Sequence, residues 1–304
     1  KKNGVFIFGE KADDRIRELL RDKRPAYIGV SVTTSSFVDG VRIIELAKSE
    51  LPGIKGIMGG AHISALRERV LEATPQVDYT VIGEGEEAVE GLMRSGGSGL
   101  TGIPGIVYRD GDDVLFSGHR GKGIELDSLP FPAYEKLSGY PDTYKLPIFN
   151  YPTAPNASCI SSRGCPYECS YCDRSVFRKS FRFNSAEYLY EHLRYLKERW
   201  GIRHINFYDD QFTFHRRRVK EFCDMMIERP LNMTFNCAVR AEHVDLELLK
   251  QMKGAGCWMI SLGIETGDPE LLARHRQNAD LDLLADRIRD IKQAGIRTKG
   301  LLMM

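Results

Sequence analysis

The chain has 304 residues, of which 42% are hydrophobic and 28% charged, and its formal net charge is +1. This composition is typical of a globular protein of about two domains, and near neutrality gives no electrostatic reason to expect nucleic acid or a membrane surface as a partner. No apolar run approaches the roughly 18 residues of a bilayer span, and no signal-peptide pattern stands at Lys1. Seven unevenly spaced cysteines argue against a secreted disulfide framework and favour a cytoplasmic protein.

Strand and helix patterns alternate in the first third of the chain. Apolar runs predict strands at 5–8, 27–32, 54–58 and 79–82, and helical spacing follows each of them, at 13–20, 41–48, 64–73 and 87–93. The alternation predicts a doubly wound, flavodoxin-like parallel sheet within residues 1–125, ending in a hairpin over 105–116. Such domains have five parallel strands, so we expect a first strand–helix unit to be missing.

The carboxyl ends of these strands are the expected ligand-binding edge. They carry small or polar residues: Ser31 and Thr33, then Gly59 and Gly60, then Gly83, Glu84 and Gly85. Small hydroxyl side chains and glycine residues would leave space for a long ligand to lie along the strand ends.

Residues 126–155 are rich in Pro and aromatic residues and predict an ordered crossing between domains. From residue 156 the alternation resumes, with strands at 157–161, 204–208, 233–239, 258–264 and 298–304 and helices between them. Five βα units are the front of a (β/α) barrel, and a closed barrel would need more chain. The sequence begins without Met and stops inside an apolar run, so we expect a piece of a longer protein, with residues 156–304 truncated at the carboxyl end.

Three thiols stand close together in "SSRGCPYECSYCDR", which covers residues 161–174. Structural zinc wants four ligands, usually in two pairs, and Cys159 is the nearest other thiol, in the preceding strand. A [4Fe–4S] cluster held by Cys165, Cys169 and Cys172 would keep one iron without a protein ligand, free to bind a substrate. The loop follows a strand, so it lies at the face where barrels keep their active sites.

This C-x3-C-x2-C loop, with Tyr171 before the last Cys, resembles that of the radical S-adenosylmethionine (SAM) superfamily. The stretches "INFYDDQF" (205–212) and "VRAEHVDLELLKQMKGAGCWMISLGIETG" (239–267) resemble later strands of its cobalamin-binding branch. The resemblance implies that SAM chelates the open iron. Where the superfamily has Gly-Gly-Glu, this chain has Asp209, Asp210 and Gln211, and either carboxylate could accept from the SAM ammonium.

Two further residues complete the expected SAM site. Arg240 could pair with the SAM carboxylate, and Glu265 could accept from the ribose hydroxyls. The alternatives are a surface acidic pair for Asp209 and Asp210, and a structural salt bridge between Arg240 and Glu265.

The stretches "YIGVSVTTSS", "IKGIMGGAH" and "DYTVIGEGEEAV" resemble the cobalamin-binding domain that precedes such cores. The Asp-x-His-x-x-Gly motif, whose His ligates cobalt in the classical domain, is missing from the sequence. The resemblance therefore implies base-off cobalamin without a His ligand, and we expect His62 to be a loop or N-cap-region residue and not a metal ligand.

The resemblance implies an enzyme that reductively cleaves SAM to a 5'-deoxyadenosyl radical and methylates an unactivated carbon of a small metabolite through methylcobalamin, as a class B C-methyltransferase. A ferredoxin or flavodoxin would donate electrons; no nucleic acid or membrane partner is expected. The alternatives are a non-methylating cyclase or oxidoreductase similar to the magnesium-protoporphyrin ester cyclase, or a cobalamin sensor without chemistry. No side chain is assigned as acid or base.

Overall fold

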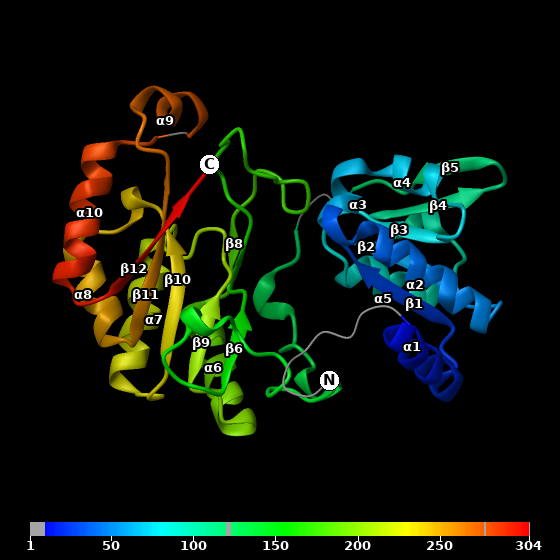
Figure 1. Cartoon of the computed structure of the whole chain (residues 1–304), viewed down its shortest axis with the longest axis horizontal. Helices are drawn as coiled ribbons and strands as arrows, with labels where there is room; N and C mark the ends of the chain where they lie inside the picture. The colour runs from blue at the N-terminus through cyan, green and yellow to red at the C-terminus, as the bar shows by residue number, and fades with distance from the viewer. Residues whose placement is uncertain (1–9, 120–122, 277, 304) are drawn as a thin grey trace. The chain divides into compact units, whose positions relative to one another are not determined.

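The computed structural model describes residues 10–119, 123–276 and 278–303, which form two compact units (Figure 1). Unit 1 comprises Lys1–Gly123 and Arg174–Arg178, and unit 2 comprises Ile124–Asp173 and Lys179–Met304. The strand predicted at 5–8 lies outside the described residues.

Unit 1 is built on one five-stranded sheet. Three parallel strands are followed by an antiparallel hairpin, in the order β1 (Tyr27–Ser31), β2 (Lys55–Gly59), β3 (Tyr79–Val81), β4 (Ile106–Asp110) and β5 (Asp113–Phe116). Its helices are α1 (Glu10–Lys23), α2 (Phe37–Glu50), α3 (Ala61–Leu66), α4 (Glu68–Ala73) and α5 (Glu86–Ser95), with short 3-10 turns η1 (Thr34–Ser36) and η2 (Leu100–Gly102). The predicted doubly wound sheet and its hairpin are confirmed.

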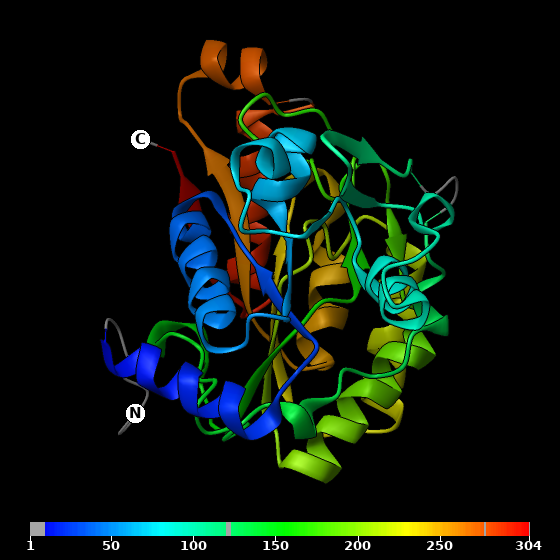
Figure 2. The same ribbon diagram turned by 90° about the vertical axis from the view of Figure 1, so that its right-hand side faces the viewer.

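Successive strand residues of unit 1 pack on opposite faces of the sheet, as the period of two requires. Met58 packs with Ile44 of α2 and Leu71 of α4, whereas Ile57 packs with Leu92 of α5. Helices therefore cover both faces of the sheet (Figure 2). The helix predicted at 64–73 is broken in two, because Arg67 takes a left-handed backbone conformation with φ 61°.

Unit 2 is built on five parallel strands, the front of the predicted barrel. Their order is β6 (Asn156–Cys159), β9 (His204–Phe207), β10 (Thr234–Val239), β11 (Cys257–Glu265) and β12 (Arg297–Leu302). The helices are α6 (Ala186–Trp200), α7 (Arg216–Glu228), α8 (Leu246–Gly254), α9 (Pro269–His275) and α10 (Leu281–Gln293). Figure 1 shows α6, α7, α8 and α10 along one side of the strands.

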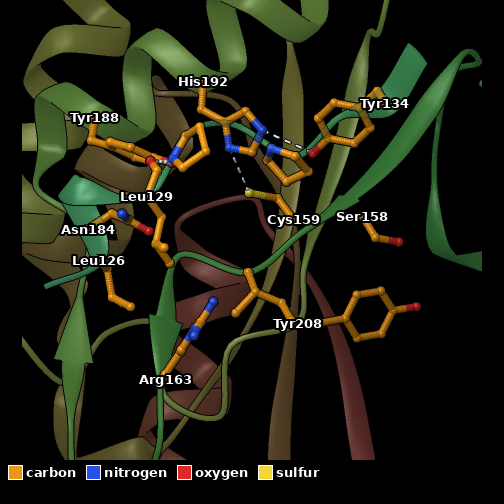
Figure 3. Close-up of a pocket in the computed structure, with 13 residues that line it drawn as sticks. Leu126, Leu129, Tyr134, Ser158, Cys159, Arg163, Asn184, Tyr188, His192 and Tyr208 are labelled. Carbon is orange, nitrogen blue, oxygen red and sulfur yellow. Dashed lines mark hydrogen bonds between the residues drawn. The ribbon is translucent and has the colours of Figure 1, made fainter. Parts of the chain in front are cut away.

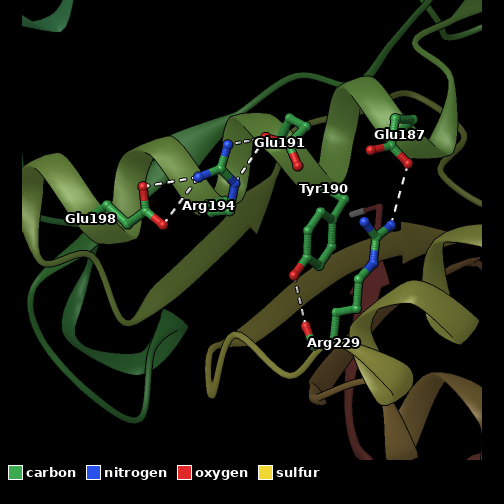
Figure 4. A network of polar contacts seen from close by, with 6 residues as sticks. All are labelled: Glu187, Tyr190, Glu191, Arg194, Glu198 and Arg229. Carbon is green, nitrogen blue, oxygen red and sulfur yellow. Dashed lines mark hydrogen bonds and ion pairs between the residues drawn. The ribbon is translucent and has the colours of Figure 1, made fainter.

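The helix α6 illustrates how sequence sets these elements. Ser185 caps its first turn by accepting from the Tyr188 amide at 3.1 Å, and Gly201 ends it in the left-handed conformation. Tyr190 is buried on the core side, where its hydroxyl donates to the Arg229 carbonyl at 2.8 Å (Figure 4). The exposed side carries ion pairs of Arg194 with Glu191 and Glu198.

The Pro- and aromatic-rich segment packs entirely within unit 2. It contains the short turns η3 (Leu126–Ser128), η4 (Tyr134–Lys136) and η5 (Ile148–Asn150). Tyr134 is buried in the core, and Tyr140 meets Trp200 edge-on with ring centroids 5.1 Å apart. Tyr144 and Phe149 of the same segment are exposed, at 47% and 85%, and the ordered crossing between domains stays a prediction. No helix in the described ranges is long and apolar enough to cross a membrane.

Candidate functional site: the cysteine loop and the ends of the strands

The three clustered cysteines lie on a loop that is closed at its base. The loop leaves the sheet after β6 and returns at a two-stranded antiparallel ladder, β7 (Ser162–Arg163) with β8 (Arg182–Phe183). Gly164 begins the loop with φ +87°, and a Cβ there would lie 2.2 Å from the carbonyl oxygen of Ser180. Only glycine fits this crossing of the two loop arms.

The three thiols differ in exposure. Cys169 is buried, Cys165 is half-buried and Cys172 is exposed. The Cys172 amide donates to the Cys169 carbonyl at 3.1 Å, which forms a turn, and burial raises the pKa of the Cys165 thiol. Within the described ranges, no three His, Cys, Asp or Glu side chains are grouped so that they could hold a single metal ion.

Asp209 holds the base of the cysteine loop from the end of β9. Its carboxylate is 3% exposed and accepts from the amides of Ser161 and Ser162 and from the Ser161 hydroxyl, each at 2.6 Å. Burial raises the pKa of Asp209, while these donors and the charge of Arg218 oppose the shift. Because each of these contacts donates to the carboxylate, the geometry suits its ionised form.

Arg218 of α7 completes this buried network. It is 1% exposed and donates to the Ser161 hydroxyl and, at 3.1 Å, to the Asn184 carbonyl. The Ser161 hydroxyl thus accepts a hydrogen bond from Arg218 and donates one to Asp209, so it links the two charged side chains. Sequence analysis missed Arg218, since it lies in a run of three arginines that reads as a solvated helix start.

The tip of the cysteine loop is fixed to two other parts of unit 2. The Ser170 amide donates to the His275 carbonyl of α9 at 3.0 Å, and their side chains lie 2.8 Å apart. Tyr167 hydrogen-bonds His243 of η6 (Ala241–His243) at 2.7 Å. These contacts, missed at the sequence level, join residues more than seventy positions apart.

The residues expected to bind SAM do not share one environment. Asp209 is committed to the loop base, whereas Asp210 is an exposed residue. Burial raises the pKa of the Asp210 carboxyl, the Gly164 amide opposes this, and the Asp210 charge in turn raises the pKa of Cys165. The next residue, Gln211, has a buried Oε1 without a hydrogen-bond partner among the described residues. A carboxylate and an unpaired acceptor beside the loop fit the ammonium group of SAM.

Arg240 lies against the loop from the end of β10. Its Nη1 is 3.6 Å from the Cys169 sulfur, and its guanidinium stacks on the Tyr167 ring at 3.9 Å. It forms an ion pair with Glu242 at 2.8 Å, and the salt bridge considered between Arg240 and Glu265 stays an alternative.

Glu265 ends β11 with φ +65°, next to an irregularity in the pairing of that strand with β12. Burial raises the pKa of Tyr171, and the charges of Cys169 and Glu265 raise it further. Tyr171 therefore lies within electrostatic reach of Glu265. Tyr171 itself is 40% exposed. Glu265 and Tyr171 thus come together at the carboxyl-end side of unit 2.

The glycines and hydroxyls expected to bind cobalamin gather at the carboxyl ends of the strands of unit 1. Gly60 has φ +105°, and a Cβ there would lie 2.5 Å from the Val32 carbonyl oxygen. The residue that passes the end of β1 therefore has no room for a side chain. Ser31 and Thr33 are exposed, and the Thr33 hydroxyl lies 3.0 Å from that of Ser35. Gly59 ends β2, and a Cβ added there would meet nothing closer than Val81 at 3.8 Å.

The third strand end completes the same edge. The Gly83 amide donates to the Ser64 hydroxyl at 3.0 Å, and Gly85 precedes the first turn of α5, with Glu84 between them half-buried. His62 lies 3.0 Å from the Thr34 hydroxyl through its Nδ1. Exposed hydroxyls and glycine backbone therefore lie at the strand ends, and their role in binding cobalamin stays a prediction.

A parallel half-barrel with three thiols at its strand ends follows a doubly wound domain in the sequence, and this combination is typical of enzymes that bind an iron–sulfur cluster and a second cofactor. The family models agree: "Radical SAM superfamily" matches residues 159–304, and "B12 binding domain" matches residues 5–93. The chain belongs to the cobalamin-binding radical SAM enzymes. These two domains imply a [4Fe–4S] cluster, SAM and cobalamin.

Curated relatives and solved structures point to the same family. The chain is 29% identical over 94% of its length to an uncharacterized methyltransferase of Pyrococcus horikoshii, covering 61% of that protein. It is 25% identical over 95% to the anaerobic magnesium-protoporphyrin IX monomethyl ester cyclase of Rubrivivax gelatinosus, covering 52%. It is 27% identical over 94% to the hopanoid C-3 methylase of Methylococcus capsulatus, covering 54%.

The same fold occurs in two solved cobalamin-dependent radical SAM enzymes. OxsB with aqua-cobalamin superimposes with a TM-score of 0.80 at 21% identity, over 96% of this chain and 43% of OxsB. TsrM from Kitasatospora setae gives 0.78 at 18% identity, over 96% of this chain and 61% of TsrM. The chain spans only about half to three-fifths of the length of the three curated relatives above.

Proposed function

We propose that this chain is the cofactor-binding part of a radical SAM C-methyltransferase that methylates an unactivated carbon of a small molecule. One observation carries the proposal. The loop with Cys165, Cys169 and Cys172 is anchored at the carboxyl ends of a parallel half-barrel, and the Asp210 carboxyl interacts with Cys165 and with the Gly164 amide of that loop.

Each part of the loop has a role in this proposal. The three thiolates hold the cluster, and Asp210 with Gln211 accepts from the amino group of SAM. Asp209 fixes the loop base and so positions the first thiol. When bound, the cluster and SAM supply a 5'-deoxyadenosyl radical, and cobalamin carries the methyl group.

Arg240 has two roles in the same scheme. Stacked on Tyr167 and close to Cys169, it neutralises part of the thiolate charge. Its guanidinium also pairs with the SAM carboxylate in this proposal, because the planar fork of a guanidinium matches the two oxygens of a carboxylate. Glu265 is the acceptor proposed for the ribose hydroxyls.

Unit 1 binds cobalamin in this scheme through Ser31, Thr33 and the glycine-rich ends of β2 and β3. We propose the base-off form without a His ligand, because His62 already bonds Thr34. The reductant is a small electron carrier such as a ferredoxin or flavodoxin, acting in the cytoplasm.

A second reaction has specific support. The Rubrivivax relative is a cyclase and not a methyltransferase, and it is 25% identical over 95% of this chain. A non-methylating cyclase or oxidoreductase would use the same cofactors. The methyltransferase is preferred because the Pyrococcus relative, at 29% identity, and the hopanoid C-3 methylase carry that activity in their names.

Anaerobic reconstitution of the full-length protein tests the proposal. About four irons and one corrinoid per chain, with 5'-deoxyadenosine released on reduction with SAM, are expected. S-Adenosylhomocysteine formed alongside identifies a methyltransferase, whereas 5'-deoxyadenosine alone identifies the cyclase type. Zinc in place of iron, or no SAM cleavage by the reduced protein, would leave a cobalamin sensor and overturn the proposal.

A further inference from the structure

The cysteine loop contacts the turn after β10 through a stack of rings. The Tyr167 hydroxyl hydrogen-bonds Nε2 of His243 at 2.7 Å, and the two rings stack with centroids 5.7 Å apart and 27° between their planes. Phe214 meets both rings edge-on, with its centroid 6.1 Å from that of Tyr167 and 5.2 Å from that of His243. Because three rings pack together and two of them share a hydrogen bond, Tyr167 is held in one position.

Tyr167 in turn supports the guanidinium of Arg240. The guanidinium carbon lies 3.9 Å from the centre of the Tyr167 ring, and Arg240 is 4% exposed. A cation over an aromatic face is attracted to the ring, and the attraction is stronger where water is excluded. The position of the Tyr167 ring therefore influences the position of the guanidinium.

The edges of this guanidinium face two different partners. Nη2 donates to the Glu242 carboxylate at 2.8 Å, and Nη1 donates to the Cys169 sulfur at 3.6 Å. The His243 amide also donates to the Arg240 carbonyl at 3.1 Å, so Arg240, Glu242 and His243 belong to one turn. The ion pair with Glu242 is internal to this turn, whereas the hydrogen bond to Cys169 reaches the cysteine loop.

His243 is well suited to hold the loop against this turn. Its Nδ1 is buried without a partner, so among the described residues the bond to Tyr167 is the one hydrogen bond of this ring. Burial lowers the pKa of His243, Glu242 opposes this shift and Arg240 adds to it. The imidazole is therefore neutral at pH 7 and does not repel the guanidinium.

A group beside a cluster ligand changes the reduction potential of the cluster. Net charge, hydrogen bonds to the sulfurs and solvent exposure all contribute to that potential. Reduction adds a negative charge, so an N–H donated to a ligating sulfur stabilises the reduced cluster more than the oxidised one. The Arg240 N–H at Cys169 therefore favours reduction.

We propose that His243 is a positioning residue that sets the reduction potential of the cluster through Tyr167 and Arg240. Its ring fixes Tyr167, Tyr167 supports the guanidinium, and the guanidinium keeps an N–H at the Cys169 sulfur. The proposal rests on the proposed function, since it takes Cys169 as a cluster ligand.

A redox titration followed by electron paramagnetic resonance tests the proposal on the reconstituted full-length protein, without SAM. His243→Phe keeps a ring in the stack and removes the hydrogen bond, and Tyr167→Phe removes the same bond from the other side. We expect each variant to make one-electron reduction of the cluster about tenfold less favourable, which lowers the midpoint potential by about 59 mV. His243→Gln, whose amide can reach the Tyr167 hydroxyl, should stay close to the wild-type potential.

A double variant shows whether His243 acts through Arg240. Arg240→Gln removes the charged donor at Cys169 and should lower the potential at least as much as His243→Phe does. When His243→Phe is added to Arg240→Gln, the potential should change no further.

Two matched controls separate this route from general effects. Tyr134 hydrogen-bonds Nε2 of His192 at 3.0 Å, in a second Tyr–His pair of unit 2 beside Cys159 (Figure 3). Tyr134→Phe breaks that pair and should leave the potential unchanged, because Cys159 is not one of the three proposed ligands. His275→Phe should also leave it unchanged, since His275 holds the same loop through Ser170 and not through Tyr167.

Several results would overturn the proposal. Wild-type potentials in Tyr167→Phe and His243→Phe would do so, and Tyr167→Phe decides alone if His243→Phe takes up no cluster. An equal fall in His275→Phe would trace the effect to a loosened loop. A further fall on adding His243→Phe to Arg240→Gln would show that His243 does not act through the guanidinium.

The failure of the proposed function would look different. The iron and sulfide content of the wild-type protein and its cleavage of SAM are measured first. A wild-type protein that binds zinc or no cluster overturns the proposed function, and this inference with it. A four-iron protein that cleaves SAM, and whose potential ignores the His243 and Tyr167 variants, overturns only this inference.

Discussion

The buried network at the base of the cysteine loop gives a sharp prediction for Asp209→Asn. Asn keeps an oxygen that can accept from the Ser161 and Ser162 amides, so the shape of the site survives. The negative charge that compensates Arg218 is lost, and that guanidinium is 1% exposed. Breaking a buried charge pair costs about 3–5 kcal/mol. Because Asn retains the amide bonds, we expect about 3 kcal/mol, a fall of roughly 6–12 °C in the unfolding temperature of unit 2.

The assay combines anaerobic thermal unfolding with iron and sulfide analysis after reconstitution. We expect Asp209→Asn to lose cluster faster than wild type, because the loop base is no longer held. The double variant Asp209→Asn, Arg218→Met should recover at least half of the lost stability, since it removes the uncompensated charge as well.

Glu247→Gln, which breaks the exposed ion pair with Lys220, is the control and should leave the unfolding temperature unchanged. An Asp209→Asn protein within about 0.5 kcal/mol of wild type would refute the charge argument. A double variant less stable than the single variant would do the same.

Three further outcomes are expected. Tyr190→Phe removes the hydrogen bond to the Arg229 carbonyl and should lower the free energy of unfolding by about 1 kcal/mol, measured by denaturant titration. Gly164→Ala cannot pass the Ser180 carbonyl, so reconstituted iron content should fall sharply in an otherwise folded protein. The free energy of unfolding should also fall as the pH drops from 6.5 toward 4. In this range His192 is protonated in the unfolded chain, where its pKa is about 6.5, but stays neutral in the folded protein, where its pKa is about 4. The difference is about 3 kcal/mol at most, measured as unfolding free energy against pH and compared with His192→Gln.

A control variant accompanies each of these three predictions, and its result can contradict the prediction. Arg194→Gln, on the exposed side of α6, should be neutral, and a loss equal to that of Tyr190→Phe would point to a general helix effect. Gly267→Ala has open space and should keep full iron content. Parallel pH profiles for wild type and His192→Gln would show that His192 carries no such linkage.

Much of the fold follows from periodicity in the sequence. The five strands of unit 2 could be predicted because apolar runs and burial coincide there. The helix α9 was not predicted, although Asp268 before Pro269 is a strong start signal, since only one of its seven residues, Leu272, is buried. The break at Arg67 has no glycine or proline to signal it.

The thiols of the proposed cluster site could be predicted from the sequence, whereas the residues that hold their loop could not. A fixed spacing singles out Cys165, Cys169 and Cys172, because the three residues lie close together in the sequence. The choice between Asp209 and Asp210 stayed open, because it depends on which side chain accepts from the amides of Ser161 and Ser162. Arg218 and His275 are long-range partners, and no local pattern distinguishes them from solvated residues.

The anchoring of the cysteine loop also constrains how the protein is made. Ser170 is held by His275, which leaves the ribosome 105 residues later. At about 5–20 residues per second, translation separates the two by several seconds to tens of seconds. The cysteines of a nascent chain are therefore exposed to oxygen and stray metal before their framework exists. We therefore expect the proposed cluster to be inserted after α9 has left the ribosome. A short excised peptide with the three cysteines would lack the contacts with His275 that hold the loop.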